Sequence, residues 1–242
     1  MIQPECKRHL RRSKQESEEE GMTRLILVRH GTSEANAQGR IDEDGSGSPL
    51  AKRGLQEAAL VARRLAEGGG MAAIYTSPLQ RAQQTAETIG RELGLTPIVR
   101  DGLKEAGMGK AGGLTEQEVV EMFPLEWAKS GGDAARFWEE IQEALGAEDH
   151  AGFLQRVMAT LGGIVAAHPQ DSVAVVTHSA VHATYLAHLV EGDPRKWPEY
   201  DAWRPCGLTE LEVVEGKGEI IALNDCRHLA NLSESRLKCN AV

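Results

Sequence analysis

Short apolar runs alternate along the chain with longer segments of helical periodicity, and this alternation restricts the folds that the chain can adopt. Repeated strand–helix units give a mostly parallel sheet with helices on both faces. Four apolar runs have the length of strands, at residues 25–28, 72–75, 97–99 and 172–177. Helices are predicted at residues 49–67, 77–93 and 152–167, and another begins near Ser179. We therefore expect an α/β fold, in the form of a three-layer α/β/α sandwich.

Residues 105–150 interrupt this alternation. The segment is rich in glycine at first and then helical, and it contains Trp127, Phe137 and Trp138. This pattern fits an inserted cap segment better than a part of the sheet. Nearer the C-terminus, two strands at residues 208–214 and 219–223 predict a hairpin.

The two ends of the chain differ from the middle. Residues 7–14 are mainly basic and residues 16–20 mainly acidic, with few large apolar side chains. Such a segment buries too little surface to offset the entropy lost on ordering. We therefore expect a flexible charged tail over residues 1–22, one domain over 23–230 and a C-terminal tail over 231–242.

The bulk composition argues against several classes of protein. A formal net charge of −9 disfavours non-specific nucleic-acid binding, because a polyanion is repelled unless basic residues are segregated into a patch. No apolar run reaches membrane-spanning length, and no signal-peptide core follows the N-terminal charges. The cysteines lack CxxC spacing, so we interpret them as free thiols; they are Cys6, Cys206, Cys226 and Cys239. We expect a cytoplasmic protein without nucleic-acid or membrane partners.

Three strand-to-helix junctions carry residues suited to binding an anion. The first strand ends at Arg29, His30 and Gly31, Arg81 falls in the first turn of the second predicted helix, and His178 ends a later strand. Ligands of open parallel sheets bind at the carboxyl ends of strands, where these junctions meet. Arginine can hold a phosphate through two hydrogen bonds, and glycine lets the backbone approach closely. Each residue alone is more often structural, but their coincidence indicates an anion pocket.

An ordered set of motifs continues around these junctions. They are RHG at 29–31 with Asn36 and Gly39-Arg40, PLAKRGLQ at 49–56, TSPLQRAQQTA at 76–86, LKE at 103–105, VAVVTHSAV at 173–181 and NDCRHL at 224–229. RHG alone is a weak match, whereas the ordered set is specific. The set resembles the histidine phosphatase superfamily, also called phosphoglycerate mutase-like, in its phosphatase branch. Under this resemblance residues 23–230 form a histidine phosphatase domain, with the cap inserted at about 105–150.

The resemblance implies how a phosphoryl group is held and transferred. His30 would attack the phosphorus of a phosphomonoester and form a phosphohistidine, for which its imidazole must be neutral. Arg29, Arg81 and His178 would surround the transferring oxygens, and Asn36 would add a neutral donor. No metal and no other cofactor is implied.

The resemblance also implies a proton donor. Glu105 would protonate the leaving alkoxide and then deprotonate the attacking water. That role requires a carboxyl pKa raised by its surroundings. Glu34 is the competing carboxylate, although we expect it in a solvated loop.

Further residues beside the pocket are candidates for substrate binding. They are Gly31, Thr32, Ser179 and His182, in addition to Asn36. Thr32 stands where the family commonly has an acidic or amide residue, and Ser179 replaces a glycine. We interpret Ser179 as a helix cap, like Ser77 before the second helix. His182 has helical i, i+4 spacing to His178 without the glutamate of HExxH, so we interpret it as a substrate-side or helix-surface residue rather than a metal ligand.

Three functions remain open from the sequence. The first is a metal-independent phosphatase acting on a small phosphorylated metabolite. The second is a phosphoglycerate mutase-type phosphoryl transfer, disfavoured because residues 107–109 lack the Tyr-Gly pair of the mutases. The third is a non-catalytic binding protein of the same fold, disfavoured because His30, Arg81 and His178 are all present. The expected partner is a small phosphomonoester, the sequence leaves a homodimer open, and aromatic residues at 193–206 either stack on the substrate or anchor their loop.

Overall fold

The computed structural model describes residues 21–42, 45, 47–200, 203–214 and 216–232. Apart from residues 21–22 and 231–232, the predicted tails lie outside these residues, as do Cys6 and Cys239. Cys206 and Cys226 are described, and both are free and buried.

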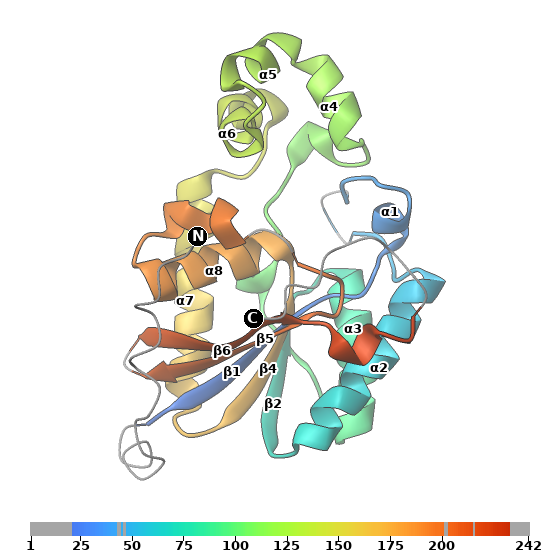
Figure 1. The fold of residues 1–242 in the computed structure, drawn as a ribbon, viewed down its shortest axis with the longest axis vertical. Helices are drawn as coiled ribbons and strands as arrows, with labels where there is room; N and C mark the ends of the chain where they lie inside the picture. The colour runs from blue at the N-terminus through green and yellow to red at the C-terminus, as the bar shows by residue number, and fades with distance from the viewer. Residues whose placement is uncertain (1–20, 43–44, 46, 201–202, 215, 233–242) are drawn as a thin grey trace.

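A six-stranded sheet forms the centre of the fold, in the order β3-β2-β4-β1-β5-β6 (Figure 1). The strands are β1 (Thr23–Arg29), β2 (Met71–Thr76), β3 (Ile98–Val99), β4 (Ser172–Thr177), β5 (Leu208–Val214) and β6 (Lys217–Asp225). The first four pair with one another in parallel, while β5 is antiparallel to both β1 and β6. The predicted hairpin is therefore the antiparallel end of a mostly parallel sheet.

Helices cover both faces of the sheet (Figure 1). One side carries α2 (Lys52–Gly68) and α3 (Gln80–Leu93), and the other carries α7 (His150–Ala167) and α8 (Ser179–Glu191). This arrangement confirms the predicted α/β/α sandwich.

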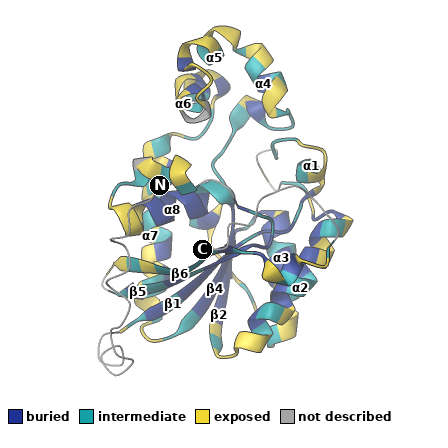
Figure 2. Cartoon of the chain, viewed as in Figure 1, coloured by how far each residue is buried: buried dark blue, intermediate teal, exposed yellow. Residues whose placement is uncertain are grey.

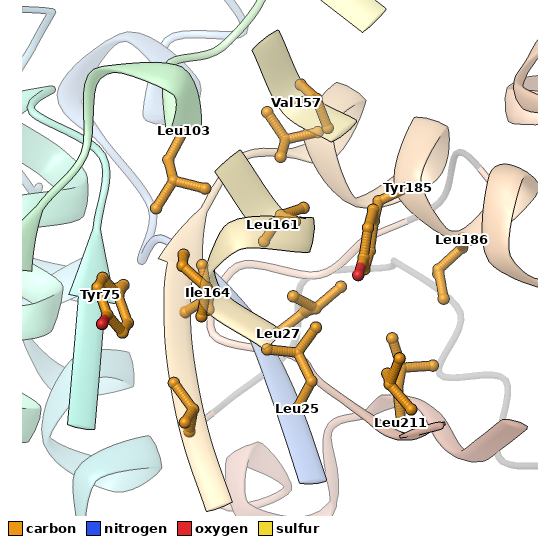
Figure 3. Close-up of a cluster of buried hydrophobic side chains, with 14 of the residues drawn as sticks. Leu25, Leu27, Tyr75, Leu103, Val157, Leu161, Ile164, Tyr185, Leu186 and Leu211 are labelled. Atoms are coloured by element: carbon orange, nitrogen blue, oxygen red, sulfur yellow. The ribbon is translucent and has the colours of Figure 1, made fainter. Parts of the chain in front are cut away.

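The strand β1 is buried on both of its faces, as its unbroken apolar sequence requires. Leu25 and Leu27 pack with α7 and α8, as Figure 3 shows, while Ile26 and Val28 pack with α2 and α3. All four are at most 4% exposed, and the central strands are dark blue in Figure 2. Hydrophobic cores on both faces of the sheet therefore hold β1 in place, and its carboxyl end positions the residues that follow it.

The segment between β3 and β4 rises away from the sheet (Figure 1). Its helices are α4 (Glu116–Met122), α5 (Pro124–Ser130) and α6 (Ala134–Leu145), preceded by the 3₁₀ turns η2 (Asp101–Leu103) and η3 (Gly109–Ala111). They share a small core of their own, made by Ala111, Val119, Phe137, Ile141 and Leu145. We call this segment, residues 105–150, the cap.

Two predicted helix caps are wrong. The helix α3 begins at Gln80, with Leu79 in the N-cap position, because residues 77–79 form an extended turn. The Ser77 hydroxyl instead accepts a hydrogen bond from the Leu79 amide, at 3.2 Å, and contacts His178. Ser179 is the first residue of α8, and His178 holds the N-cap position without a side-chain cap, because its backbone is still extended from β4.

Among the residues that the structure describes, no helix combines the length and apolar character needed to cross a membrane.

The remaining short helical elements lie in the connections between the larger helices and strands. They are α1 (Glu34–Ala37), η4 (Pro194–Tyr200) and η5 (Arg227–Leu229).

Two helical glycines provide a test of how tightly the loop after β1 is packed. A Cβ at Gly54 would lie 2.1 Å from the Thr32 carbonyl oxygen, whereas one at Gly162, on α7, would meet nothing within 4 Å. We expect Gly54→Ala to lower the free energy of unfolding by about 1–3 kcal/mol, because backbone atoms must shift. Gly162→Ala should raise it by about 0.5–1 kcal/mol, because the helix gains a better former.

Denaturant unfolding of the two variants beside the parent protein measures both effects. A stable Gly54→Ala variant would contradict the close contact between α2 and this loop.

Candidate active site

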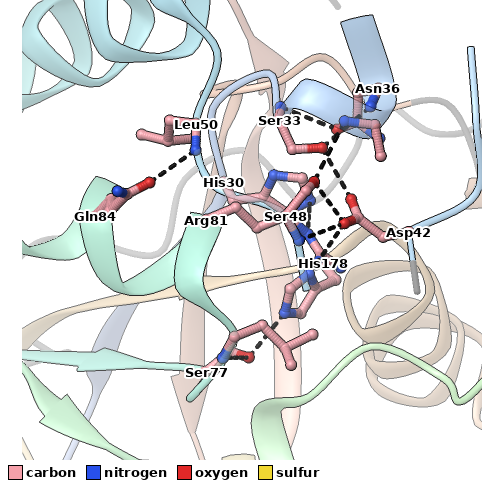
Figure 4. A network of polar contacts seen from close by, with 12 residues as sticks. His30, Ser33, Asn36, Asp42, Ser48, Leu50, Ser77, Arg81, Gln84 and His178 are labelled. Atoms are coloured by element: carbon pink, nitrogen blue, oxygen red, sulfur yellow. Dashed lines mark hydrogen bonds and ion pairs between the residues drawn. The ribbon is translucent and has the colours of Figure 1, made fainter. Parts of the chain in front are cut away.

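His30, Arg81 and His178 meet at the carboxyl edge of the sheet (Figure 4). Backbone pairing continues one residue past the strands, because the His30 amide bonds to the Thr177 carbonyl at 3.0 Å and the Ser77 amide to the Val176 carbonyl at 3.0 Å. The junctions after β1, β2 and β4 are thus held side by side. The imidazole rings of His30 and His178 lie with their centroids 5.0 Å apart.

His30 is only 2% exposed, and its hydrogen bonds define its protonation. Nδ1 lies 2.8 Å from the Gly31 carbonyl oxygen, which can only accept, so Nδ1 carries the proton. Nε2 therefore has the lone pair, and it accepts a hydrogen bond from Arg81 Nε at 3.1 Å. Burial, and then the positive charges of Arg81 and Arg29, hold the pKa of His30 well below its usual value. The imidazole is neutral, as a nucleophile must be.

His178 is also buried and neutral. Its Nε2 lies 2.8 Å from the Ser77 hydroxyl, an arrangement that the interpretation of Ser77 as a helix cap missed. Burial and the nearby Arg81 hold the pKa of His178 well below its usual value. Ser77 therefore orients the second imidazole instead of capping a helix.

Arg81 brings a buried positive charge next to His30 and close to His178. Its guanidinium is 3% exposed, and Nη1 lies 3.4 Å from Asp42 Oδ1. Asp42 also accepts hydrogen bonds from the Ser48 amide and hydroxyl and from the Ser33 hydroxyl, at 2.6–2.8 Å. Burial lowers the pKa of Arg81, but a guanidinium stays protonated in proteins. Asp42 is the counter-ion of this cation, and the sequence motifs did not single it out.

Arg29 ties the end of β1 to the loop before β5. Its Nη1 donates to the Trp203 carbonyl oxygen, and its own carbonyl accepts from the Cys206 amide at 2.9 Å. The Trp203 ring is 5% exposed and packs edge-on against His182, with centroids 4.9 Å apart. The sequence left open whether the aromatic residues of this loop stack on the substrate or anchor the loop. The packing of Trp203 against His182 anchors the loop, and the residue also lines the cleft.

Glu105 lies at the base of the cap, half-buried. Its Oε1 accepts from the Ala106 amide at 3.1 Å and its Oε2 from the Ala180 amide, in the first turn of α8, at 3.5 Å. Burial raises the pKa of this carboxyl, although Arg81 opposes the shift. This environment suits a proton donor, whereas the alternative carboxylate, Glu34, is exposed on α1.

Several other candidates have partners within the protein. Gly31 meets α2, since a Cβ there would lie 2.7 Å from the Gly54 carbonyl oxygen, so this contact rather than an anion requires glycine. The Thr32 amide and hydroxyl both donate to Glu57 at 2.8 Å. The side-chain Oδ1 of Asn36 accepts from the Ser33 amide at 3.4 Å, in the capping box of α1.

His182 is not at the helix surface, so that interpretation is wrong. Its ring is fully buried and does not line the cleft, and neither ring nitrogen has a hydrogen-bond partner among the residues that the structure describes. Burial, followed by Arg29, lowers its pKa to about 3. The spacing from His178 places His182 one turn further along α8, below the cleft.

A cleft of about 2090 Å³ opens between the sheet edge and the cap. Its floor includes Arg29, His30 and Arg81, and Thr32, Asn36 and Ser179 also line it. Trp138 and Glu139 of the cap lie on its upper side, with Glu105 at the base of the cap. In the described part of the chain, no group of three or more His, Cys, Asp or Glu side chains could hold a metal ion.

The sequence of this chain is similar to those of several curated proteins. "Phosphoserine phosphatase 1" of Hydrogenobacter thermophilus is 34% identical over 214 residues, which cover 86% of this chain and 95% of that protein. "Bifunctional protein Rv2228c" of Mycobacterium tuberculosis is 36% identical over 159 residues, 64% of this chain, and the match spans only 41% of the mycobacterial protein.

Solved structures have the same fold. Bacillus stearothermophilus YhfR superposes with a TM-score of 0.74 at 29% identity, over 86% of this chain and 99% of that one. A mycobacterial glucosyl-3-phosphoglycerate phosphatase bound to VO3 gives a TM-score of 0.71 at 23% identity, over 84% and 99% of the two chains, and this likeness concerns the fold alone.

The family model of branch 1 of the histidine phosphatase superfamily matches residues 25–226. This range includes Arg29, His30, Arg81 and Glu105 of the cleft, and His178 beneath them. The chain belongs to the histidine phosphatase superfamily, branch 1.

Proposed function

We propose that this protein is a metal-independent phosphomonoesterase that hydrolyses a small phosphorylated metabolite through a phosphohistidine. The observation that carries the proposal is the state of His30: a buried, neutral imidazole whose Nε2 lone pair faces the guanidinium of Arg81 in an open cleft. The reaction class, phosphoric monoester hydrolysis, is supported by the match to branch 1 of the histidine phosphatase superfamily and by relatives that are named as phosphatases.

In the first step, His30 Nε2 attacks phosphorus in line with the leaving oxygen. The N–P bond forms as the P–O bond to the leaving group breaks, and Glu105 gives its proton to the departing alkoxide. Arg81 turns from Nε2 to a phosphoryl oxygen, and Arg29 and His178 complete the set of donors. The Nδ1 proton stays hydrogen-bonded to the Gly31 carbonyl oxygen, which stabilises the phosphorylated ring.

In the second step, a water molecule enters where the leaving group stood. Glu105, now ionised, takes a proton from this water, whose oxygen attacks phosphorus as the N–P bond breaks. Inorganic phosphate leaves, and His30 and Glu105 return to their starting states. One carboxyl thus serves both steps, which its raised pKa favours.

The nature of the substrate follows from the need for an acid. A phosphate ester of an aliphatic alcohol has a poor leaving group and needs the proton that Glu105 provides. Phosphoserine is such an ester, and two relatives are named as phosphoserine phosphatases. Phosphoserine is therefore the first compound to test in a panel of phosphorylated metabolites.

Release of inorganic phosphate, with His30→Ala as the blank, scores this panel. Product analysis by ³¹P NMR separates hydrolysis from mutase-type transfer, which moves the phosphoryl group to another hydroxyl. A rearranged ester without free phosphate would overturn the phosphatase assignment in favour of the mutase.

Brief incubation with ³²P-labelled substrate and alkaline quenching should trap an acid-labile phosphoryl group on His30. Replacing the nucleophile by alanine should remove the label and lower kcat by roughly 10⁴- to 10⁶-fold. Addition of EDTA should leave the activity of the parent protein unchanged. Full activity of His30→Ala would refute the nucleophile, and loss of activity with EDTA would refute metal independence.

Glu105→Gln should discriminate between leaving groups. The value of kcat/KM reports only the first step, in which the leaving group departs. For an alkyl phosphate it should fall roughly 10²- to 10⁴-fold in this variant, whereas for p-nitrophenyl phosphate it should fall far less, because nitrophenolate leaves without a proton. The raised pKa means that the acid stays protonated to higher pH than an ordinary glutamate. In the parent protein, kcat/KM for the alkyl phosphate should therefore decline only as the pH rises through that raised pKa, and Glu105→Gln should lack this decline.

Measured pH profiles of kcat/KM for both substrates check this expectation. Equal losses of kcat/KM with the two leaving groups would show that Glu105 is not the donor.

A further inference from the structure

Arg156, on α7, contacts the backbone segment that carries Glu105. Its Nη1 donates to the carbonyl oxygens of Gly102, at 3.0 Å, and Lys104, at 2.7 Å. Its Nη2 donates to the carbonyl oxygen of Glu105 itself, at 3.0 Å. One side chain from a core helix thus binds three carbonyls at the entrance to the cap.

The same guanidinium forms a two-point ion pair with Glu148. Nε lies 2.6 Å from Glu148 Oε1, and Nη2 lies 2.6 Å from Oε2. A guanidinium has five N–H donors, and these two bonds together with the three carbonyls use all five. This saturation depends on the planar fork of arginine; a lysine ammonium has three donors at a single point.

Glu148 in turn closes the base of the cap. Its amide donates to the Gly107 carbonyl at 2.8 Å, and its Oε2 accepts from the Gly107 amide at 3.1 Å. The chain entering the cap and the chain leaving it are therefore joined at this level, directly beside Glu105.

The turn η2, which precedes Glu105, is closely packed on both sides. A Cβ on Gly102 would lie 1.9 Å from the Thr160 hydroxyl of α7, so the turn η2 lies flat against that helix. On the other side, the Thr177 hydroxyl donates to the Leu103 carbonyl at 2.7 Å. The Glu105 carboxylate accepts hydrogen bonds from the backbone amides of Ala106 and Ala180, so its position follows the backbone.

We propose that Arg156 is a positioning residue for Glu105, with Glu148 as its counter-ion. The proposal rests on the proposed function, in which Glu105 is the proton donor. Arg156 fixes the backbone at residues 102–105, and that fixed backbone holds the carboxyl at the distance from the leaving oxygen that proton transfer needs. Displacement of a catalytic group by about 1 Å can lower a rate ~100-fold.

The test compares Arg156→Lys with the parent protein on an alkyl phosphate and on p-nitrophenyl phosphate. Lysine keeps the charge but lacks the fork, so kcat/KM for the alkyl phosphate should fall roughly 10- to 100-fold. For p-nitrophenyl phosphate, whose transfer to His30 needs no acid, kcat/KM should fall less than about 3-fold. Glu148→Gln keeps the volume of the partner and should show the same discrimination in weaker form.

A double-mutant cycle links the effect to the acid. In a Glu105→Gln background, Arg156→Lys should produce no further loss with the alkyl phosphate, because the group that it positions is absent. Arg136→Lys is the matched control: Arg136 pairs with Glu140 on the cap surface, where its side chain is 62% exposed, and its change should leave both activities unaltered.

Three results would overturn the proposal. The first is an equal loss with both substrates in Arg156→Lys, as a general loss of folded protein would give. The second is a raised KM with unchanged kcat, which would make Arg156 a substrate-binding residue. The third is a full additional loss in the Glu105→Gln background.

Failure of the proposed function gives a different result. Equal losses in Glu105→Gln itself would overturn the acid assignment and this proposal with it. Discrimination by Glu105→Gln without discrimination by Arg156→Lys would overturn this proposal alone.

Discussion

The buried guanidinium of Arg81 is the interaction on which the rest of the site depends. A cation that is 3% exposed is unfavourable unless it is paired. The fold places on one side of it the carboxylate of Asp42, which three further donors hold in place. On the other side lie two imidazoles, whose pKa values the same charge helps to lower. One buried charge therefore suits the proposed anion site and helps to keep His30, the proposed nucleophile, neutral.

This arrangement depends on the sheet more than on the loops. Because β1, β2 and β4 are adjacent and parallel, His30, Arg81 and His178 reach one edge without any long excursion of the chain. Packing on both faces of β1 then limits how far that edge can move. The order of the strands in the sheet thus brings the charged and titratable residues of the cleft together.

The sequence predicted the sheet, the hairpin and the meeting of the charged residues because apolar runs and strand ends are local signals. It did not predict the roles of Ser77 and Asp42, because a serine before Pro78 has the pattern of a helix cap and Asp42 sits in no motif. His182 was misjudged for a related reason: its spacing from His178 gives the helix turn but not the burial beside Trp203. Contacts between distant segments, such as Arg156 with residues 102–105, leave no periodic trace in one sequence.

The small core of the cap has a consequence for how such an enzyme diversifies. Its five buried members all come from residues 111–145, and none belongs to either core of the sheet. Substitutions that reshape these helices therefore alter the upper wall of the cleft while the strands that carry the phosphate site keep their packing. The part of the cleft proposed to recognise the alcohol and the part proposed to transfer the phosphoryl group can then change independently under selection, because separate sets of buried side chains stabilise them.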